Sequence, residues 1–490
     1  MKPNILFLMC DQLRGDALGS SGNPAAETPH LDFLASRGTV FERAYSACPS
    51  CLPARASLWS GLDQYHAGIL GMGSGQPQLC NTFGHTLAGE LTRGGYQTML
   101  VGKGHFHPQR ESMGFERIWL DESGRRDSPG FVSDYRTWFA RHAPPGTTPD
   151  DHGVEWNSWL ARPWHLAEEL HPTAWTAMQA LDAVATRDPE RPLFLNVSFA
   201  RPHSPYVPPP YFFELHERNS RLPEPYIGDW CASHRDAGAG LHTEAWHGDI
   251  RPDRVRRGRA AYYGEVSFID SRIGHLLTYL RLYYSDFWRN CWIVFTADHG
   301  DMLGDHYLWR KTFAYEGSTH IPLFIVPPAS HAAAVRRDAK HVAELRDIMP
   351  TILEMAGLPA PDYLDGASLL PLMRGESPAW RRWLHGEHCT CYAPEQEMQF
   401  ITDGEVKLVW LPRTGEEQFF DLVADPGECR NLIADPAFAE RAAEARRELI
   451  ARLAARRCGW CENGKLSAPA GHMISRWANQ PYRGQDREQA

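Results

Sequence analysis

Short apolar runs recur along the chain, and each of them ends at a polar or glycine-rich segment. The clearest runs cover residues 5–10, 97–101, 193–199 and 292–296, with further ones at 40–45 and 321–326. A short, uniformly apolar run is typical of a strand that is buried on both faces of a sheet. The pattern therefore predicts an α/β domain in which buried strands alternate with helices.

Helical periodicity is clearest over residues 259–284, where apolar side chains recur at alternating steps of four and three. We interpret this stripe as core packing. Thr28 and Pro29 are typical of a helix start, and Gly38 is typical of a helix end. Further helices are expected before Gly94, within residues 165–187 and around residues 341–356.

The pattern changes beyond a stretch rich in Pro and Arg near residues 377–383. Residues 398–422 predict short strands joined by Asp-Gly and Thr-Gly turns, which favours antiparallel hairpins. A helix is expected to follow over residues 437–456. We therefore expect a large domain at 1-378, a small antiparallel α+β subdomain at 379-456 and a tail at 457-490.

Composition narrows the classes of function. The chain of 490 residues carries a net charge of −10, so a general nucleic-acid binder is not expected, and an anionic substrate would need a locally positive pocket. No apolar run approaches the roughly 20 residues of a membrane span. The first apolar run is too short for a signal peptide, and Asp11 follows it at once. The 11 cysteines are odd in number and scattered, which favours a reducing, cytoplasmic location.

The stretch around Cys51 predicts a turn that leads into a short helix. Pro53 fits the first helical turn, and Gly61 can end the helix. Cys51 would then lie just before a helix N-terminus, which favours an anion, with the positive charge of Arg55 one turn further on. The residues alone also allow a buried structural cysteine, or a redox or metal-binding C-x-x-C pair with Cys48.

Chemically active side chains follow the predicted strands. In an open α/β sheet, ligands gather beyond the carboxyl ends of the strands. An adjacent carboxylate and imidazole, as in Asp298-His299, can both face one cation. Taken singly, Asp11, Lys103 and His105 are more often solvated or capping loop residues than functional ones. The residues at or shortly after strand ends are Asp11, Gln12, Lys103, His105, His203, Asp298 and His299.

Five motifs in this order resemble the type I sulfatases, a formylglycine-dependent family. They are Cys51-x-Pro53-x-Arg55 with Gly61, G-K-x-H at 102–105, P-H-x-P at 202–205, T-A-D-H-G-D-x-x-G at 296–304, and Lys311 before Tyr315-Glu316-Gly317. The resemblance extends from Asn4 to about Leu432. It is partial at two positions, because Gly104 stands where the family often has Trp, and Gln12 where many members have a second Asp.

The resemblance implies an alkaline phosphatase-like fold. That fold is a large mixed, mostly parallel sheet flanked by helices, with a smaller C-terminal antiparallel α+β subdomain. It also implies oxidation of Cys51 to formylglycine by a formylglycine-generating enzyme, and one divalent cation. Oxygen-rich ligation favours Ca²⁺, with Mg²⁺ or Mn²⁺ as alternatives. The implied metal ligands are Asp11, Gln12 through its amide oxygen, the modified Cys51, Asp298 and His299.

The family mechanism also implies catalytic roles. A hydroxyl of the hydrated Cys51 aldehyde would attack sulfur, while Lys103 and Lys311 hold sulfate oxygens. His203, together with Lys311, would protonate the leaving oxygen. His105 would help to remove a proton from the second hydroxyl, which expels sulfate. The implied catalytic residues are Cys51, Arg55, which steadies the developing oxyanion, Lys103, His105, His203 and Lys311.

Three functions are weighed on this basis. The favoured one is hydrolysis of a small anionic sulfate monoester, whether aryl, carbohydrate or alkyl. A phosphonate monoester or phosphodiester hydrolase of the same superfamily is the alternative, because Asp11-Gln12 resembles those enzymes and the choline sulfatases. Against it, Lys103-x-His105 resembles true sulfatases. A non-enzymatic thiol or metal protein built on Cys48/Cys51 and Cys458/Cys461 would explain none of the polar residues at the strand ends. No membrane partner is expected, and the tail is a candidate subunit contact in a homo-oligomer.

Overall fold

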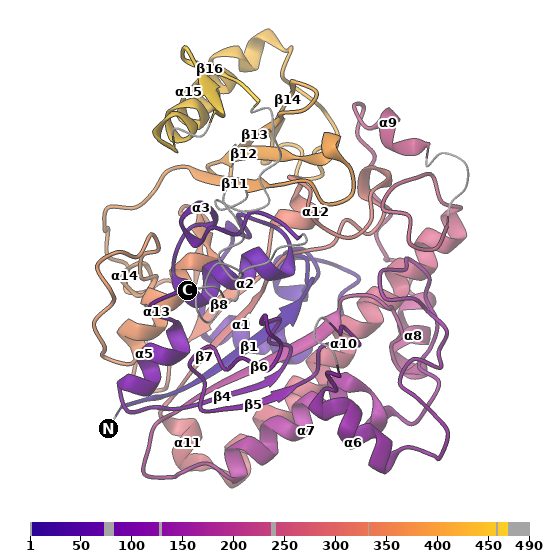
Figure 1. The fold of residues 1–490 in the computed structure, drawn as a ribbon, viewed down its shortest axis with the longest axis vertical. Coiled ribbons are helices and arrows are strands. Elements are labelled where there is room, and N and C mark those ends of the chain that lie inside the picture. Colours follow the sequence, from indigo (N-terminus) through magenta and orange to yellow (C-terminus); the bar gives the residue numbers. More distant parts are fainter. Residues whose placement is uncertain are drawn as a thin grey trace.

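A mixed, mostly parallel sheet of eight strands forms the centre of the protein (Figure 1). The structure, a computed structural model, describes residues 2–72, 83–126, 130–236, 242–331, 333–456 and 459–468. The strand order is β5-β4-β6-β1-β7-β8-β2-β9. The first five strands in that order are mutually parallel, while β8 runs antiparallel to both of its neighbours. The predicted fold class is confirmed.

The predicted apolar runs form the central strands, and their side chains are almost completely buried. The strands of the sheet are β1 (Asn4–Asp11), β2 (Thr39–Phe41), β4 (Gln97–Gly102), β5 (Arg117–Leu120), β6 (Leu193–Pro202), β7 (Cys291–Ala297), β8 (Leu323–Val326) and β9 (Arg337–Asp338). The run at 40–45 was expected to be one strand but divides in two, because β3 (Ala44–Tyr45) leaves the sheet and pairs with β10 (Ala343–Glu344).

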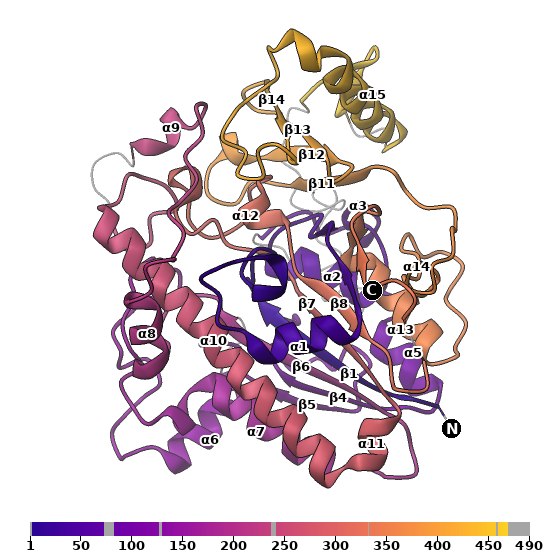
Figure 2. The same cartoon turned by 180° about the vertical axis from the view of Figure 1, so that it is seen from behind.

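Helices cover both faces of the sheet (Figures 1 and 2). On one face, α10 (Pro252–Tyr283) packs against α1 (Pro29–Arg37) and α7 (Pro172–Ala185). On the other, α2 (Cys51–Ser60), α5 (Leu87–Arg93) and α13 (Ile348–Met355) pack together. The helix α10 begins earlier than the expected 259, because Pro252 can start a helix whose first turns are too polar to show the apolar stripe.

The expected helix around 341–356 is shorter than predicted, because β10 and the 3-10 turn Leu345–Asp347 occupy its first residues. The other α-helices that the structure describes are α3 (Gln64–Ala67), α6 (Asp134–His142), α8 (Pro210–Glu217), α9 (Ala232–Arg235), α11 (Ser285–Arg289), α12 (Glu316–Thr319) and α14 (Leu370–Met373). The remaining 3-10 turns are Gly19–Ser21, Glu168–Leu170, Asp305–Tyr307, Pro394–Gln396 and Pro436–Phe438. None of the helices described here has the length and apolar character needed to cross a bilayer.

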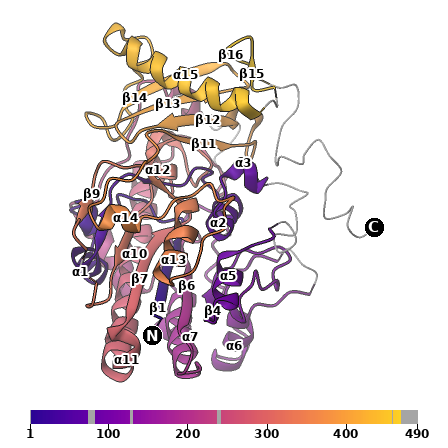
Figure 3. The same cartoon turned by 90° about the vertical axis from the view of Figure 1, so that its left-hand side faces the viewer.

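The C-terminal region forms a four-stranded antiparallel sheet that packs under one long helix (Figure 3). Its strands are β11 (Leu384–His388), β12 (Met398–Thr402), β13 (Val406–Leu411) and β14 (Glu416–Asp421), and the helix is α15 (Ala439–Arg456). The hairpins were expected, but β11 was not, because its sequence has no apolar alternation. A small hairpin, β15 (Cys461–Glu462) and β16 (Lys465–Leu466), follows α15. Cys458 of the second C-x-x-C lies outside the described residues, and the domain boundaries remain predictions.

Candidate active site

Four central strands end at one edge of the sheet, and their polar residues meet the start of α2 there. Asp11 ends β1, Lys103 follows β4, His203 follows β6 and Asp298 follows β7. Cys51 is the first residue of α2, which lies between the central sheet and the C-terminal strands (Figure 1). Each of these side chains is almost fully buried. The parallel topology therefore brings together residues that are up to 287 positions apart in the sequence, from Asp11 to Asp298.

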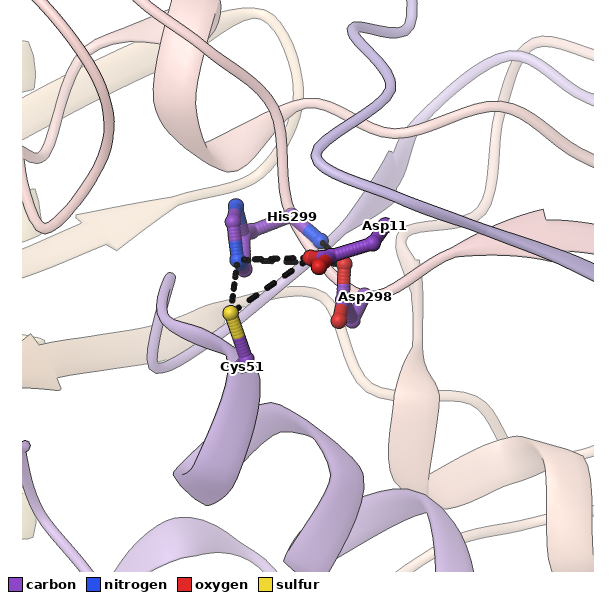
Figure 4. A group of neighbouring side chains, drawn as sticks. All are labelled: Asp11, Cys51, Asp298 and His299. Atoms are coloured by element: carbon purple, nitrogen blue, oxygen red, sulfur yellow. Dashed lines mark hydrogen bonds and ion pairs between the residues drawn. The ribbon is translucent and has the colours of Figure 1, made fainter. Parts of the chain in front are cut away.

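Cys51 lies beside three residues that can bind a metal (Figure 4). Its Sγ is 3.1 Å from His299 Nε2 and 3.4 Å from Asp11 Oδ1. Ligand atoms of Asp11, Cys51, Asp298 and His299 all lie within 4.8 Å of one another. Such a spacing allows one cation to contact all four side chains, which agrees with four of the five expected ligands.

The orientation of the His299 ring fits a metal ligand, because Nδ1 is bound to the backbone and Nε2 faces the other candidate ligands. Its Nδ1 lies 2.9 Å from the carbonyl of Gly300, so Nδ1 carries the proton and donates it there. The other ring nitrogen, Nε2, faces Asp11 Oδ1 at 3.6 Å and Asp298 Oδ1 at 3.8 Å. Burial lowers the pKa of His299, but Asp298 and the Cys51 sulfur raise it to a net value above its ordinary one. These neighbours stabilise a positive charge at this point, and the oxygen and nitrogen ligand atoms around it suit a divalent cation.

Arg55 is wholly buried and fixes three parts of the site relative to one another. Its Nε donates to Asp298 Oδ2 at 2.8 Å, and its Nη1 donates to the carbonyl of Lys103 at 2.6 Å. The same Nη1 lies 3.1 Å from Ser198 Oγ of β6. Its Nη2 is buried and has no hydrogen-bond partner among the described residues. Arg55 therefore positions Asp298 and the Lys103 loop, and it keeps one donor for a ligand.

Lys103 forms a completely buried ion pair with Asp11. Its Nζ also lies 3.6 Å from Cys51 Sγ. Burial opposes ionisation of Asp11, but the Lys103 ammonium holds the pKa of its carboxyl well below its usual range. Burial and Asp11 likewise raise the pKa of the Cys51 thiol, yet Lys103 and other cations lower it to a net value below its ordinary one. The site therefore favours negative charge at the position of Cys51.

Lys311 reaches the opposite side of the site. Its Nζ lies 2.6 Å from His203 Nε2 and 2.8 Å from Gln12 Oε1. The amide oxygen of Gln12 thus accepts a hydrogen bond from Lys311 in this arrangement. The side-chain nitrogen of Gln12 donates a hydrogen bond to Asp301. The role of Gln12 as a metal ligand remains a prediction.

His105 is buried in the loop after β4 and has a left-handed φ of 53°. Its backbone N–H and that of Gly104 both donate to Glu122 Oε1, at 2.9 and 3.0 Å. Its Nδ1 is buried without a hydrogen-bond partner among the described residues. Burial, with the charges of Arg125 and Lys103, holds the pKa of His105 well below its ordinary value. This imidazole is therefore neutral and has an unused nitrogen.

The sequence analysis did not single out Asp301, whose carboxylate accepts hydrogen bonds from Gln12 and from other residues around the site. Asp301 Oδ1 accepts the backbone N–H groups of Leu303 and Arg310, at 3.0 and 2.9 Å. Asp301 Oδ2 accepts from Tyr206 and from Gln12. Its presence inside the same motif as Asp298 was the available signal.

The sequence analysis also missed two residues near the site, because neither of them belongs to a recognisable motif. His388 of β11 lies 2.7 Å, Nε2 to Oγ, from Ser50, the residue before α2. Trp156, in a loop, packs its ring against that of His203 with centroids 4.7 Å apart. Neither contact could be predicted, because both partners are distant in the sequence.

Comparisons with known proteins agree with this geometry. The family model described as "Sulfatase" matches residues 3–358, and that for the C-terminal part of N-sulphoglucosamine sulphohydrolase matches residues 304–455. An arylsulfatase of Clostridium perfringens is 39% identical over 95% of this chain and 97% of its own length. A choline-sulfatase of Rhizobium meliloti is 30% identical, over 89% of this chain and 83% of its own length.

Solved structures show the same fold. The phosphonate monoester hydrolase of Agrobacterium radiobacter superposes with a TM-score of 0.76 at 25% identity, covering 93% of this chain and 96% of that protein. The family model spans most of this chain, and the two relatives cover nearly all of it. The chain therefore belongs to the sulfatase family, and it is a sulfuric ester hydrolase.

Proposed function

We propose that this protein hydrolyses a sulfate monoester, using a nucleophile derived from Cys51 and one divalent cation. The observation that carries the proposal is the position of Cys51. Its Sγ lies at the N-terminus of α2, 3.1 Å from His299 Nε2, 3.4 Å from Asp11 Oδ1 and 3.6 Å from Lys103 Nζ. A group at this point can contact a cation and cationic side chains at the same time.

The proposed nucleophile needs Cys51 to be oxidised to formylglycine by a formylglycine-generating enzyme. Hydrated formylglycine would supply both the hydroxyl that attacks sulfur and a second hydroxyl whose deprotonation releases sulfate. The helix N-terminus and Lys103 favour negative charge at this position. Arg55 Nη2, buried and unpartnered among the described residues, is the donor that would steady it.

The proposed cation would be held by Asp11, Asp298, His299 and the oxygen that replaces the Cys51 sulfur. Gln12 joins this set in the proposal, but only if its amide oxygen turns from Lys311. Ca²⁺ is the preferred ion because the set is rich in oxygen, with Mg²⁺ or Mn²⁺ as alternatives. When bound, the cation would supply Lewis acidity and orient a sulfate oxygen.

The remaining steps fall to the side chains. Lys103 and Lys311 would bind sulfate oxygens and offset the negative charge that grows in the transition state. Lys311, hydrogen-bonded to His203, would pass a proton to the leaving oxygen. His105, neutral and with a free nitrogen, would accept the proton of the second hydroxyl.

A phosphonate monoester or phosphodiester hydrolase is the second candidate. It is favoured by Gln12 and by the structural similarity to the phosphonate monoester hydrolase of Agrobacterium radiobacter, at a TM-score of 0.76. Against it, Lys103 and Asp11 form a buried ion pair at the reacting position, which leaves little room for a second organic group on phosphorus.

One experiment separates the two candidates. The kcat/KM values for a nitrophenyl sulfate and for a phosphodiester with the same leaving group are compared at saturating Ca²⁺. The mass of the peptide containing Cys51 reports the formylglycine content of the same sample. The proposal expects a higher kcat/KM for the sulfate. A preference for the phosphodiester would move the protein to the second candidate, and full activity with an unmodified Cys51 would contradict the proposed nucleophile.

The proposal also includes a cytoplasmic location and a homo-oligomer contact through the tail. The cytoplasmic location is proposed because the cysteines are scattered, and the nine that the structure describes are free thiols.

A further inference from the structure

A separate pocket of about 450 Å³ lies beside the catalytic centre. It is bounded by the segment after β5, by α6, by residues 149–164 and by the end of β6. A volume of this size suits a small organic molecule. Most of its lining comes from residues 121–172, which none of the five motifs includes.

The pocket and the catalytic centre share Trp156. One side of this half-buried ring packs on His203, with ring centroids 4.7 Å apart, and Lys103 Nζ lies 5.9 Å from the centroid. Arg201, which also lines the pocket, donates from Nη1 to the carbonyl of His203 at 3.2 Å. A sulfate ester whose sulfur is held near Lys103 would therefore direct its organic part past Trp156 into this pocket.

A buried carboxylate and a buried guanidinium face the pocket without pairing with each other. Asp121 is 1% exposed; its Oδ1 accepts the Ser123 N–H at 3.0 Å, while its Oδ2 has no hydrogen-bond partner among the described residues. Arg201 is 4% exposed, and its Nη1 donates to Ser123 Oγ at 2.6 Å. Its Nε lies 3.8 Å from Glu265 Oε1, and its Nη2 makes no hydrogen bond to the part of the chain that the structure describes. Buried polar groups of this kind are normally satisfied, so a ligand with both donors and acceptors fits them.

His152 adds a defined donor. Its Nδ1 accepts the N–H of Val154 at 3.0 Å, so that Nε2 carries the proton of the neutral ring. Burial lowers the pKa of His152 to about 4, which keeps the ring neutral. The pocket thus offers a carboxylate acceptor at Asp121, a guanidinium donor at Arg201 and an imidazole donor at His152.

Aromatic side chains complete the walls, namely Tyr135, Trp156 and Trp164. Flat rings pack on the C–H faces of a sugar, and the polar groups between them can bind its hydroxyls, which both donate and accept. A simple aryl group would leave the buried Oδ2 of Asp121 without a hydrogen-bond partner. A quaternary ammonium group would suit Asp121 but would be repelled by Arg201.

We infer that this pocket binds the sugar ring of a carbohydrate sulfate, with Asp121, Arg201 and His152 as specificity determinants. The inference rests on the proposed sulfate monoester hydrolysis, which supplies the position of the sulfur. The pocket holds the alcohol part of the substrate and takes no part in the cleavage itself.

The test compares sugar and aryl substrates in matched variants. The kcat/KM values for galactose-6-sulfate and N-acetylglucosamine-6-sulfate are each divided by that for phenyl sulfate. Asp121→Asn keeps the size of the side chain but replaces the unpartnered acceptor by a donor. We expect it to lower the better of these two ratios roughly 10- to 100-fold. Asp182→Asn, on the exposed face of α7, is the matched control and should leave the ratio unchanged.

The outcomes separate this inference from the proposed function. Hydrolysis of phenyl sulfate with a ratio that Asp121→Asn leaves unchanged overturns the sugar pocket and leaves the proposed function intact. Hydrolysis of phenyl sulfate by the wild-type protein without turnover of either sugar sulfate also overturns the sugar pocket and leaves the proposed function intact. Failure on all three sulfates overturns both. If Asp121→Asn does not fold, His152→Phe, which keeps a ring but removes the donor, must lower the ratio instead.

Discussion

Lys311 donates a hydrogen bond from Nζ to Nε2 of His203 over 2.6 Å. The other imidazole nitrogen, Nδ1, lies 2.7 Å from the carbonyl of Ser204 and therefore carries a proton. Burial and the charge of Lys311 hold the pKa of His203 well below its ordinary value, so the ring stays neutral. Lys311 is therefore the hydrogen-bond donor of this pair, and His203 accepts the bond and orients the lysine side chain.

This relationship predicts how Lys311→Ala depends on the leaving group. A poor leaving group needs its oxygen protonated as the bond to sulfur breaks, whereas a nitrophenolate does not. General-acid catalysis is worth roughly 10²- to 10⁴-fold, so we expect a loss in that range for an alkyl sulfate and a much smaller one for nitrophenyl sulfate. The measurement is kcat/KM for an alkyl sulfate and for phenyl sulfates of graded leaving-group pKa. Equal losses for all of them would contradict the role of Lys311 as the acid.

Cys51→Ala should abolish turnover without unfolding the protein. Cys51 is the first residue of α2, where alanine is compatible with the helix. The matched control is Cys48→Ala, because Cys48 is also buried in the same turn but has its pKa raised, by burial and by Glu387. We expect thermal unfolding to show that both variants fold and only Cys48→Ala to retain activity. A comparable rate in both would remove Cys51 from the mechanism.

Removal of the metal should abolish activity, and Asp298→Asn should weaken metal binding. The measurement is metal content by mass spectrometry after dialysis, followed by titration with Ca²⁺. Asp301→Asn offers a graded comparison, because Asp301 is not itself a predicted metal ligand but accepts a hydrogen bond from one, Gln12. Loss of such an orienting residue costs roughly 10- to 100-fold in affinity, and the loss in Asp298→Asn should be larger. Full activity of the demetallated protein would contradict the proposed cation.

Lys103→Ala should remove one preorganised donor to the sulfate. We expect the barrier to rise by about 2–4 kcal/mol, seen as a loss in kcat/KM at full metal occupancy. The exposed Lys340→Ala is the control for loss of a positive charge. Because Lys103 also neutralises Asp11, the metal content of the variant must be measured in the same preparation. A loss of less than threefold would contradict a direct role of Lys103.

Stability at low pH should depend on Glu387 in the C-terminal sheet. Burial opposes its ionisation, but Arg456, 2.7 Å away, and His385 lower the pKa of Glu387 from 4.5 to about 2. A depressed acid pKa stabilises the fold above pH 4.5 and loses this effect as the pH falls towards 2. The contribution is about 3 kcal/mol.

Urea unfolding of wild type and Glu387→Gln tests this sign. The stability difference between the two proteins should be largest near pH 6 and should shrink as the pH falls from 5 to 3. The exposed Glu440→Gln on α15 is the control and should show no such trend. A stability difference that stays constant over this range would show that Glu387 does not carry the effect.

The sequence by itself determined the local elements and the identity of the reactive side chains. The short, uniformly apolar runs form β1, β4, β6 and β7, because strands inside a sheet that is covered on both faces are buried on both sides. The start of α2 close to Cys51 follows from Pro53, since the preference of proline for a first helical turn acts over only a few residues. The motifs therefore identified residues that the structure brings together, but they did not give the distances between those residues.

Only the tertiary structure decided which side chains touch. The pairing of Lys311 with His203, the orientation of Gln12 by Asp301 and the contact of His388 with Ser50 all join residues far apart in the chain. The pocket around Asp121 arises in a region of irregular loops, where no periodicity reports burial. Such contacts depend on long-range packing and desolvation, which act between surfaces that meet only after the chain has folded.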